Sequence, residues 1–107
     1  MGSPLENLEK LVGTPRDGAL LRYSLGLEHL KAGNAARAVQ HLQEAVARDP
    51  QYSAAWKALG KTLEQAERGA EALDAYRRGI EAAKSKGDRQ AEKEMSVFAR
   101  RLEKRRG

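Results

Sequence analysis

Apolar residues recur every three or four positions through most of the chain, which is the spacing that places them on one face of an α-helix. Between residues 56 and 80, two such stripes are separated by the polar segment ERGAE. The stripes consist of Trp56, Leu59, Gly60 and Leu63, and of Ala72, Tyr76, Gly79 and Ile80. Because the segment between them is short, the pattern predicts two helices that fold back on each other as a hairpin.

A similar pattern occurs earlier in the chain, displaced by 34 residues. Five positions are identical in the two copies: Leu25 and Leu59, Gly26 and Gly60, Ala32 and Ala66, Ala36 and Ala70, and Ala38 and Ala72. A fixed period of this length is typical of stacked helical repeats, in which neighbouring units bury one continuous core. The sequence therefore predicts two similar helical hairpins in succession.

Glycine occurs in the middle of a predicted helix in each copy, at Gly26 and Gly60. Glycine there costs about 1 kcal/mol relative to alanine, which is acceptable where a large side chain of the partner helix packs against the backbone. We predict that Leu42 and Tyr76 are these side chains. In the two turns, AGNAA and ERGAE, we expect glycine to adopt the left-handed conformation that ends a helix.

Both flanks of the repeated region carry helix signals. Residues 3–13 begin with the sequence SPLE, in which Ser3 can cap a helix, proline suits its first position and glutamate completes a capping box. Residues 87–106 offer Asp88 as a cap. An apolar stripe follows it at Ala91, Met95, Phe98 and Leu102. Because stacks of this kind need about three repeats for stability, we expect both flanks to form helices that cover the two hairpins.

The spacing of small and large residues that the two copies share resembles the tetratricopeptide repeat across residues 19–86. The second copy carries WKALG at residues 56–60, followed by Ala72, Tyr76 and Gly79. The first copy carries LG followed by Ala38, Leu42, Ala45 and the dipeptide DP. It departs from the family pattern at Arg22, where the family has tryptophan, and the second copy departs from it at Lys84, where the family has proline. The resemblance implies a small bacterial protein that binds other proteins without catalysis.

Together these features predict an all-α fold in a single domain that spans residues 1–107. The resemblance makes this fold a TPR-like stack of two antiparallel helix hairpins, with an N-terminal helix and a long C-terminal capping helix. The predicted parts are the N-terminal helix (3–13), the first repeat (19–52), the second repeat (53–86) and the capping helix (87–106).

Members of the family bind peptides or helices in a concave groove lined by the first helix of each hairpin. The resemblance places Leu20, Tyr23, Leu27 and Leu30 of the first repeat, and Lys57, Lys61 and Glu64 of the second, in this groove. Lys57 and Lys61 lie one helical turn apart, so both can reach one carboxylate, and the expected ligand is an acidic peptide or helix. The pair resembles part of a carboxylate clamp, although the asparagines of that clamp are missing.

The apolar groove residues of the first repeat must be shielded from water, and the sequence leaves three alternatives for what shields them. The N-terminal helix can supply Leu5, Leu8 and Val12, a protein partner can bind there, or two copies of the chain can associate. We therefore expect a monomer or a weak homodimer, and a structural homo-oligomer stands as an alternative function.

The net charge of +5 is not a property of the whole surface, because the entire excess of basic over acidic residues lies in residues 84–107. Only this segment therefore carries a net positive charge. The basic residues near the end of the chain are Arg100, Arg101, Lys104, Arg105 and Arg106. They are candidates for anion binding, and nucleic-acid association through this helix is an alternative function. It is the less favoured one, because Phe98 is the only nearby aromatic residue for stacking against bases. Cations at a helix end also stabilise the helix dipole.

The composition contains few residues suited to catalysis. Cysteine is absent, which excludes disulfides, thiolate nucleophiles and cysteine-bound metals. The two histidines, His29 and His41, lie on different predicted helices without a recognised metal or triad spacing, and we expect His29 to have a packing role. We therefore predict no enzymatic activity, no cofactor and no metal. The sequence shows neither a signal peptide nor an apolar run of about 20 residues, so we expect a cytoplasmic protein without membrane contact.

Overall fold

The regular secondary structure is all helical in a computed structural model that describes the backbone of residues 2–106 and the side chains of residues 2–105. The helices are α1 (Pro4–Glu9), α2 (Ala19–Lys31), α3 (Ala35–Arg48), α4 (Ser53–Gln65), α5 (Gly69–Lys86) and α6 (Arg89–Arg106). The all-α fold predicted from the sequence is confirmed. Within the described part of the chain, no helix is long and apolar enough to cross a membrane.

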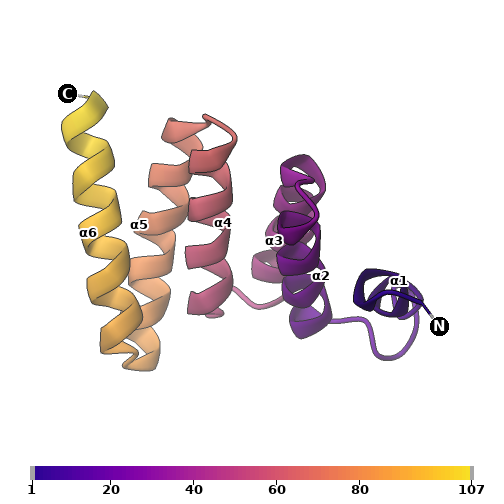
Figure 1. The fold of residues 1–107 in the computed structure, drawn as a ribbon. Coiled ribbons are helices and arrows are strands. Elements are labelled where there is room, and N and C mark those ends of the chain that lie inside the picture. The colour runs from indigo at the N-terminus through magenta and orange to yellow at the C-terminus, as the bar shows by residue number, and fades with distance from the viewer. Residues whose placement is uncertain (1, 107) are drawn as a thin grey trace.

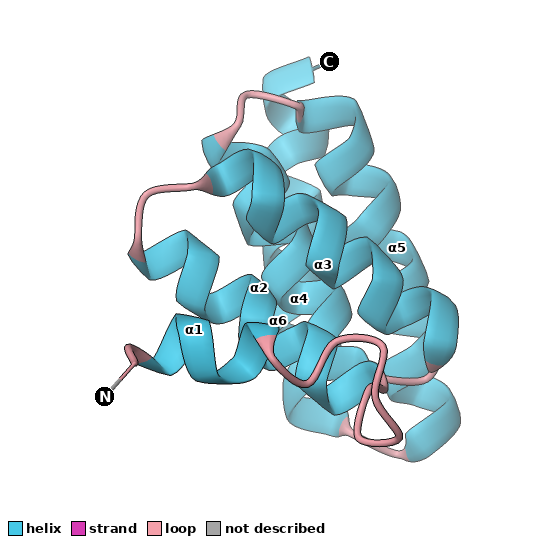
Figure 2. Cartoon of the chain, turned by 90° about the vertical axis from the view of Figure 1, so that its right-hand side faces the viewer, coloured by secondary structure: helices cyan, strands magenta, loops and turns pink. Residues whose placement is uncertain are grey.

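The helices are stacked in chain order, from α1 at one end of the molecule to α6 at the other (Figure 1). Helices α2 and α3 form one hairpin, α4 and α5 form the next, and α6 packs along α5. Viewed along the stack, α2, α4 and α6 lie on one side and α3 and α5 on the other (Figure 2). The molecule therefore has two long faces, and we call the first of them the α2–α4–α6 face.

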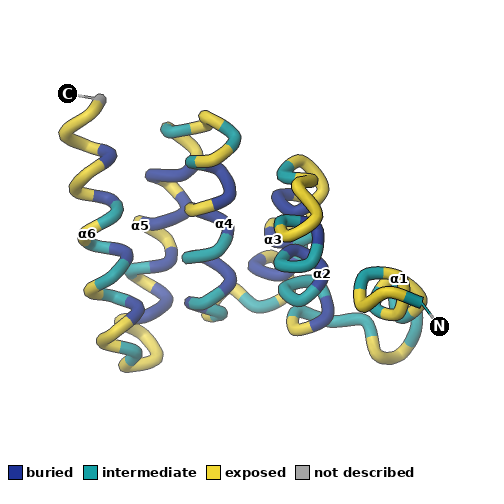
Figure 3. Tube along the Cα trace, in the orientation of Figure 1, coloured by how far each residue is buried: buried dark blue, intermediate teal, exposed yellow. Residues whose placement is uncertain are grey.

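The core lies between helices α2 to α6, whereas α1 at the end of the stack has no buried residue (Figure 3). The largest side chains that are fully buried are Tyr76, Leu25, Leu42, Met95 and Thr62. The indole of Trp56 is also buried, and its Nε1 donates a hydrogen bond of 2.8 Å to the carbonyl oxygen of Pro50. This bond gives the indole nitrogen a partner, so that its burial carries no penalty for an unpaired polar group.

The close approach predicted at the two helical glycines is confirmed. A Cβ atom added to Gly26 would lie 2.6 Å from Cγ of Leu42, and one added to Gly60 would overlap the ring of Tyr76. A third close approach was not predicted: at Gly79 an added Cβ would lie 2.7 Å from Cβ of Trp56 and would also overlap Met95. These glycines let the helices of each hairpin, and α6 with the second hairpin, approach closely.

The N-terminal helix begins as predicted but is shorter than predicted. Ser3 is its cap, and the side chain of Ser3 accepts a hydrogen bond of 3.1 Å from the backbone N–H of Glu6. The helix ends at Glu9 rather than at residue 13, and turns follow it. In these turns the hydroxyl of Thr14 donates a bond of 2.6 Å to the carbonyl oxygen of Leu11.

The segment between α1 and α2 is held by Asp17. Its carboxylate accepts a hydrogen bond of 2.9 Å from the backbone N–H of Gly13 and two bonds, of 2.9 and 3.0 Å, from the guanidinium of Arg22. These bonds favour the ionised form, so the pKa of Asp17 lies well below its usual range. Arg22, which stands where the family has tryptophan, therefore fastens the N-terminal segment to α2.

Helix α6 begins at the predicted cap. The side chain of Asp88 accepts a hydrogen bond of 3.2 Å from the backbone N–H of Ala91 and another of 3.0 Å from the hydroxyl of Ser53. These two bonds lower the pKa of Asp88, with the bond from Ala91 contributing most. The second bond joins the start of α6 to the start of α4.

The two turns within the hairpins differ from each other, and one prediction was wrong. Gly33 adopts the expected left-handed conformation, with φ of 79°. In the second turn Gly69 is the first residue of α5 instead, and Glu67 takes the left-handed conformation, with φ of 59°. Glu67 lies one repeat length after Gly33, so the repeat geometry places the left-handed residue at a position where the second copy lacks glycine.

The left-handed glutamate leads to a stability prediction. We expect Glu67→Gly to stabilise the protein by about 0.5–1 kcal/mol, because glycine adopts this conformation without the cost of about 1–2 kcal/mol that other residues incur and loses somewhat more backbone entropy on folding. Thermal unfolding followed by circular dichroism measures the change. The matched control is Glu81→Gly, at an exposed position inside α5, which should destabilise the protein by about 1 kcal/mol. A lower melting temperature for Glu67→Gly would contradict the prediction.

Candidate functional site

The apolar residues predicted for the groove lie on α2 and are only partly covered. Leu20 has 68% of its surface exposed, whereas Tyr23, Leu27 and Leu30 are half-buried. The ring of Tyr23 packs against Tyr52, the residue that precedes α4, with 5.0 Å between the ring centroids. Helix α1 contacts α2 but leaves Leu20 open, so the N-terminal helix does not cover this whole group.

The two lysines predicted to bind a carboxylate have different surroundings. Nζ of Lys57 donates a hydrogen bond of 3.0 Å to Oε1 of Glu94 on α6. Lys61 lies one turn further along α4, is exposed, and forms no ion pair with any residue the structure describes. The acidic partner of Lys57 lies on a different helix, which spacing within α4 could not reveal. Lys57 thus has a carboxylate partner, whereas Lys61 has none among the described residues.

Lys61 belongs to a cluster around the ring of Phe98, which we call the Phe98 cluster: Lys61, Glu64, Phe98 and Arg101. Nζ of Lys61 lies 5.1 Å from the centroid of the Phe98 ring, and Cζ of Arg101 lies 5.3 Å from it. Both distances fall within the range of cation–π attraction. Two positively charged groups are thereby held next to one aromatic ring at the boundary between α4 and α6.

The Phe98 cluster rests on the buried ring of Tyr76, 5.4 Å from Phe98 between centroids. The hydroxyl of Tyr76 donates a hydrogen bond of 2.5 Å to Oε2 of Glu64, and Oε1 of Glu64 lies 3.9 Å from a guanidinium nitrogen of Arg101. Burial and the carboxylate of Glu64 raise the pKa of Tyr76 far above its usual range. The phenol therefore stays protonated and keeps Glu64 in place beside Arg101.

The basic residues of the tail do not share one environment. Arg101 faces Phe98, whereas Arg100, Lys104 and Arg105 are exposed and form no ion pair with a described residue. The side chain of Arg106 lies outside the described residues. Among the described side chains of the predicted anion-binding tail, only that of Arg101 therefore lies together with residues of the predicted groove.

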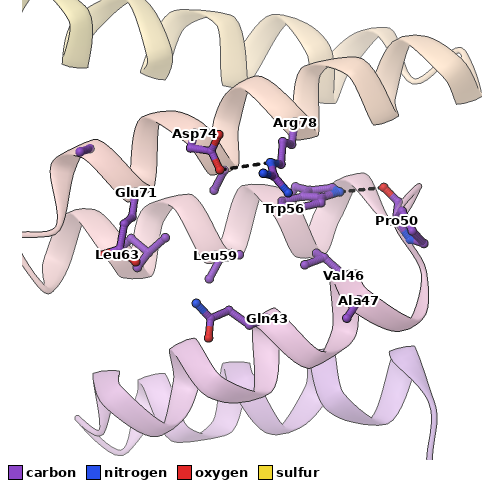
Figure 4. Close-up of a pocket in the computed structure, with 12 residues that line it drawn as sticks. Gln43, Val46, Ala47, Pro50, Trp56, Leu59, Leu63, Glu71, Asp74 and Arg78 are labelled. Atoms are coloured by element: carbon purple, nitrogen blue, oxygen red, sulfur yellow. Dashed lines mark hydrogen bonds and ion pairs between the residues drawn. The ribbon is translucent and has the colours of Figure 1, made fainter.

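A groove of about 690 Å³ lies on the opposite face, between α3 and α5 (Figure 4). Its floor is formed by apolar side chains of α4, and an ion pair of 3.1 Å between Asp74 and Arg78 lies on its α5 wall. The apolar lining includes Val46, Trp56, Leu59 and Leu63. The sequence did not predict this groove, because its width depends on how far apart the two hairpins stand.

A third group of polar side chains lies at the N-terminal end of the stack. His29 of α2 and His41 of α3 stack their rings with 5.2 Å between centroids and 13° between ring planes. Nε2 of His29 lies 3.0 Å from Oε1 of Glu9, the last residue of α1. The burial of His29 agrees with its predicted packing role. The sequence did not predict that Glu9 and both histidines meet.

Comparison with known proteins identifies several relatives. Residues 23–87 match a family model described as tetratricopeptide repeat. The TPR repeat-containing protein PA0015 of Pseudomonas aeruginosa is 49% identical over 102 residues, which is 95% of this chain and 97% of that protein. The solution structure of protein BPP2914 from Bordetella parapertussis has 41% identity and a TM-score of 0.81, and the match covers 98% of this chain and 91% of that one.

A tetratricopeptide repeat domain protein from Salinibacter ruber has a similar solution structure. It shares 37% identity and a TM-score of 0.76, over 83% of this chain and 89% of that one. Two of these relatives are thus tetratricopeptide-repeat proteins by name, and both of the solved structures match the helical stack described above.

Proposed function

Because the chain belongs to the tetratricopeptide-repeat family, we propose that it is a non-catalytic interaction module whose α2–α4–α6 face binds an acidic peptide or helix of another protein. Repeats of this family generally mediate contacts between proteins. A stack of rigid helices also supplies a preformed surface, which reduces the entropy lost when a peptide binds.

The observation that carries the proposal is the Phe98 cluster. An ammonium and a guanidinium group both lie against one aromatic ring, and the ammonium of Lys61 has no carboxylate partner among the described residues. A carboxylate next to an apolar group would contact the two cations and the ring at once. This chemistry favours a ligand in which Asp, Glu or a C-terminal carboxylate adjoins an apolar side chain.

The structure changes the proposed roles of the two lysines. The ion pair between Lys57 and Glu94 links α4 to α6, so we assign Lys57 to holding the two helices in register. Recognition of an acidic group is then the task of Lys61 and Arg101, which come from different helices. Farther along the same face, Leu20 and the partly buried Leu27 supply apolar surface for the rest of the ligand.

A peptide-binding experiment tests the proposal. A display library of random peptides is selected on the full chain, and the enriched peptides are measured by fluorescence anisotropy. We expect acidic peptides to be enriched and Lys61→Glu with Arg101→Glu to weaken their binding about tenfold or more, since tenfold corresponds to only about 1.4 kcal/mol. Both side chains are exposed, so circular dichroism should show an unchanged fold.

The matched control reverses the same kinds of charge elsewhere on the surface. Lys93→Glu with Arg100→Glu changes the net charge equally, at exposed positions on the opposite side of α6 from Phe98. We expect this control to change affinity only about twofold, as a long-range charge effect screened by salt would. Equal losses in both double variants would show general attraction by the basic helix and would contradict a site at Phe98.

A further inference from the structure

The cluster of Glu9, His29 and His41 has the composition of a metal site. Each of the three residues offers one potential ligand atom, and these atoms all lie within 4.8 Å of one another. Two imidazoles and one carboxylate form a ligand set that occurs in zinc proteins with three protein ligands and one open position. The three ligands come from three different helices, α1, α2 and α3, so one ion would join all three.

Both histidines also have an unpaired nitrogen. Nδ1 of His29 and Nδ1 of His41 are buried and have no hydrogen-bond partner among the described residues. His29 is only 6% exposed. Buried polar atoms without a partner destabilise a protein, and here two of them lie on stacked rings next to the carboxylate of Glu9. A metal ion accepts the lone pair of an imidazole nitrogen.

The electrostatic surroundings are compatible with a cation. Burial lowers the pKa of His41, and the neighbouring His29, Arg22 and Arg37 act in the same direction, while Glu9 opposes them. The charge of Arg22 is compensated by its bonds to Asp17, and the carboxylate of Glu9 supplies the negative charge of the site.

From these observations we propose that Glu9, His29 and His41 bind one divalent transition-metal ion of the Zn²⁺ type. Zinc bonds to nitrogen and oxygen are about 2.0–2.2 Å long, so the ligand atoms must draw together by roughly 1–1.5 Å from their widest separation, which rotation about the side-chain torsions provides. Water fills the fourth position. Because α1 has no buried residue of its own, the ion acts as a clamp that fastens α1 to the first hairpin.

Zinc binding to the full chain without a histidine tag tests the proposal. The protein is stripped with a chelator, and Zn²⁺ alone is added in calorimetric titration at pH 7.5. We expect one ion per chain and a rise of roughly 10 °C in melting temperature at about 100 times the dissociation constant. Hydrogen exchange of residues 4–12 should slow when zinc is present.

Three variants separate a metal site from a histidine pair that only packs. Glu9→Gln keeps an oxygen acceptor for His29 and removes the charge, and His41→Gln changes a half-buried residue with little change in size. Each should weaken zinc binding about tenfold or more, while Glu6→Gln, an exposed change on α1, should leave it unchanged. Circular dichroism without metal verifies that all variants fold.

Two results would overturn the proposal. The first is the absence of saturable binding at one ion per chain, or the presence of several weak sites only. The second is equal zinc affinity in the original chain, Glu9→Gln and His41→Gln, because an ion bound elsewhere would be insensitive to these residues. Since this site lies at α1 and the peptide site at Phe98, either proposal can fail without the other.

Discussion

A chain that ends at Gly87, and so lacks α6, should lose its cooperative thermal unfolding transition. Among the side chains of α6 that the structure describes, four are buried: Ala91, Met95, Ala99 and Leu102. The side chain of Met95 is fully buried and packs against the backbone at Gly79. Each large apolar side chain that returns to water costs about 1.5–3 kcal/mol, and removing α6 also uncovers the ring of Tyr76, which packs against Phe98.

The sum of these losses is comparable with the whole stability of a small domain, about 5–15 kcal/mol. We therefore expect the shortened chain to show a broad, weakly cooperative change in helicity instead of a sharp melting transition, as followed by circular dichroism and calorimetry. Urea unfolding should give a smaller m value, because less surface is buried in the folded chain.

A chain that begins at Thr14 is the control for loss of a terminal helix. It lacks α1, which has no buried residue, so it should still melt cooperatively, with a decrease of a few degrees at most. A truncated chain without α6 that melts as sharply as the full chain, within about 5 °C, would show that the two repeats are stable alone and would contradict our account of α6.

The substitution Gly60→Ala should destabilise the protein by about 2 kcal/mol, even though alanine favours a helix over glycine by about 1 kcal/mol. The new methyl group would overlap the ring of Tyr76. This ring has no room to retreat, because it is fully buried, packs against Phe98 and is tied to Glu64 through its hydroxyl. Overpacking of this kind costs about 1–3 kcal/mol or more.

Chemical unfolding in urea measures this loss, and two further variants test its cause. Gly69→Ala adds a methyl group where no atom lies within 4 Å and the backbone is not left-handed, so its stability should be unchanged or slightly higher. In a chain that already carries Tyr76→Ala, Gly60→Ala should become neutral or stabilising, because the clash has been removed. If Gly60→Ala is as harmless as Gly69→Ala, the close approach is not a determinant of stability.

Local features of the chain could be predicted from the sequence because they depend on neighbours in the same helix or on the repeat. Periodic apolar residues predicted the helices, and Ser3 and Asp88 were identified as caps by residue type alone. The step of 34 residues aligned Gly26 with Gly60, and so predicted their contacts with Leu42 and Tyr76. The same step also aligned Glu67 with Gly33, which indicated that Glu67 would be left-handed. The prediction chose the glycine of the second turn, Gly69, because glycine adopts this conformation most easily.

The candidate sites show where this reasoning stops. Lys57 and Lys61 were grouped because they lie one turn apart, but Glu94 binds the first of them and Phe98 lies beside the second. Both of these partners are on α6, more than 30 residues further along the chain. The relative rotation of α4 and α6 decides such pairs, and the pattern within either helix contains no information about it.

By itself, the sequence determined the helices, their pairing into two hairpins and the glycines at which those helices approach, because periodicity and repetition are properties of the chain. Only the tertiary structure decided which charged side chains are paired and which aromatic ring lies beside Lys61. It also decided that Glu9, His29 and His41 lie together. These contacts join residues of separate helices, and they depend on how side chains interlock when the helices pack. A shift of one residue in that packing would place different side chains together while leaving every helix unchanged.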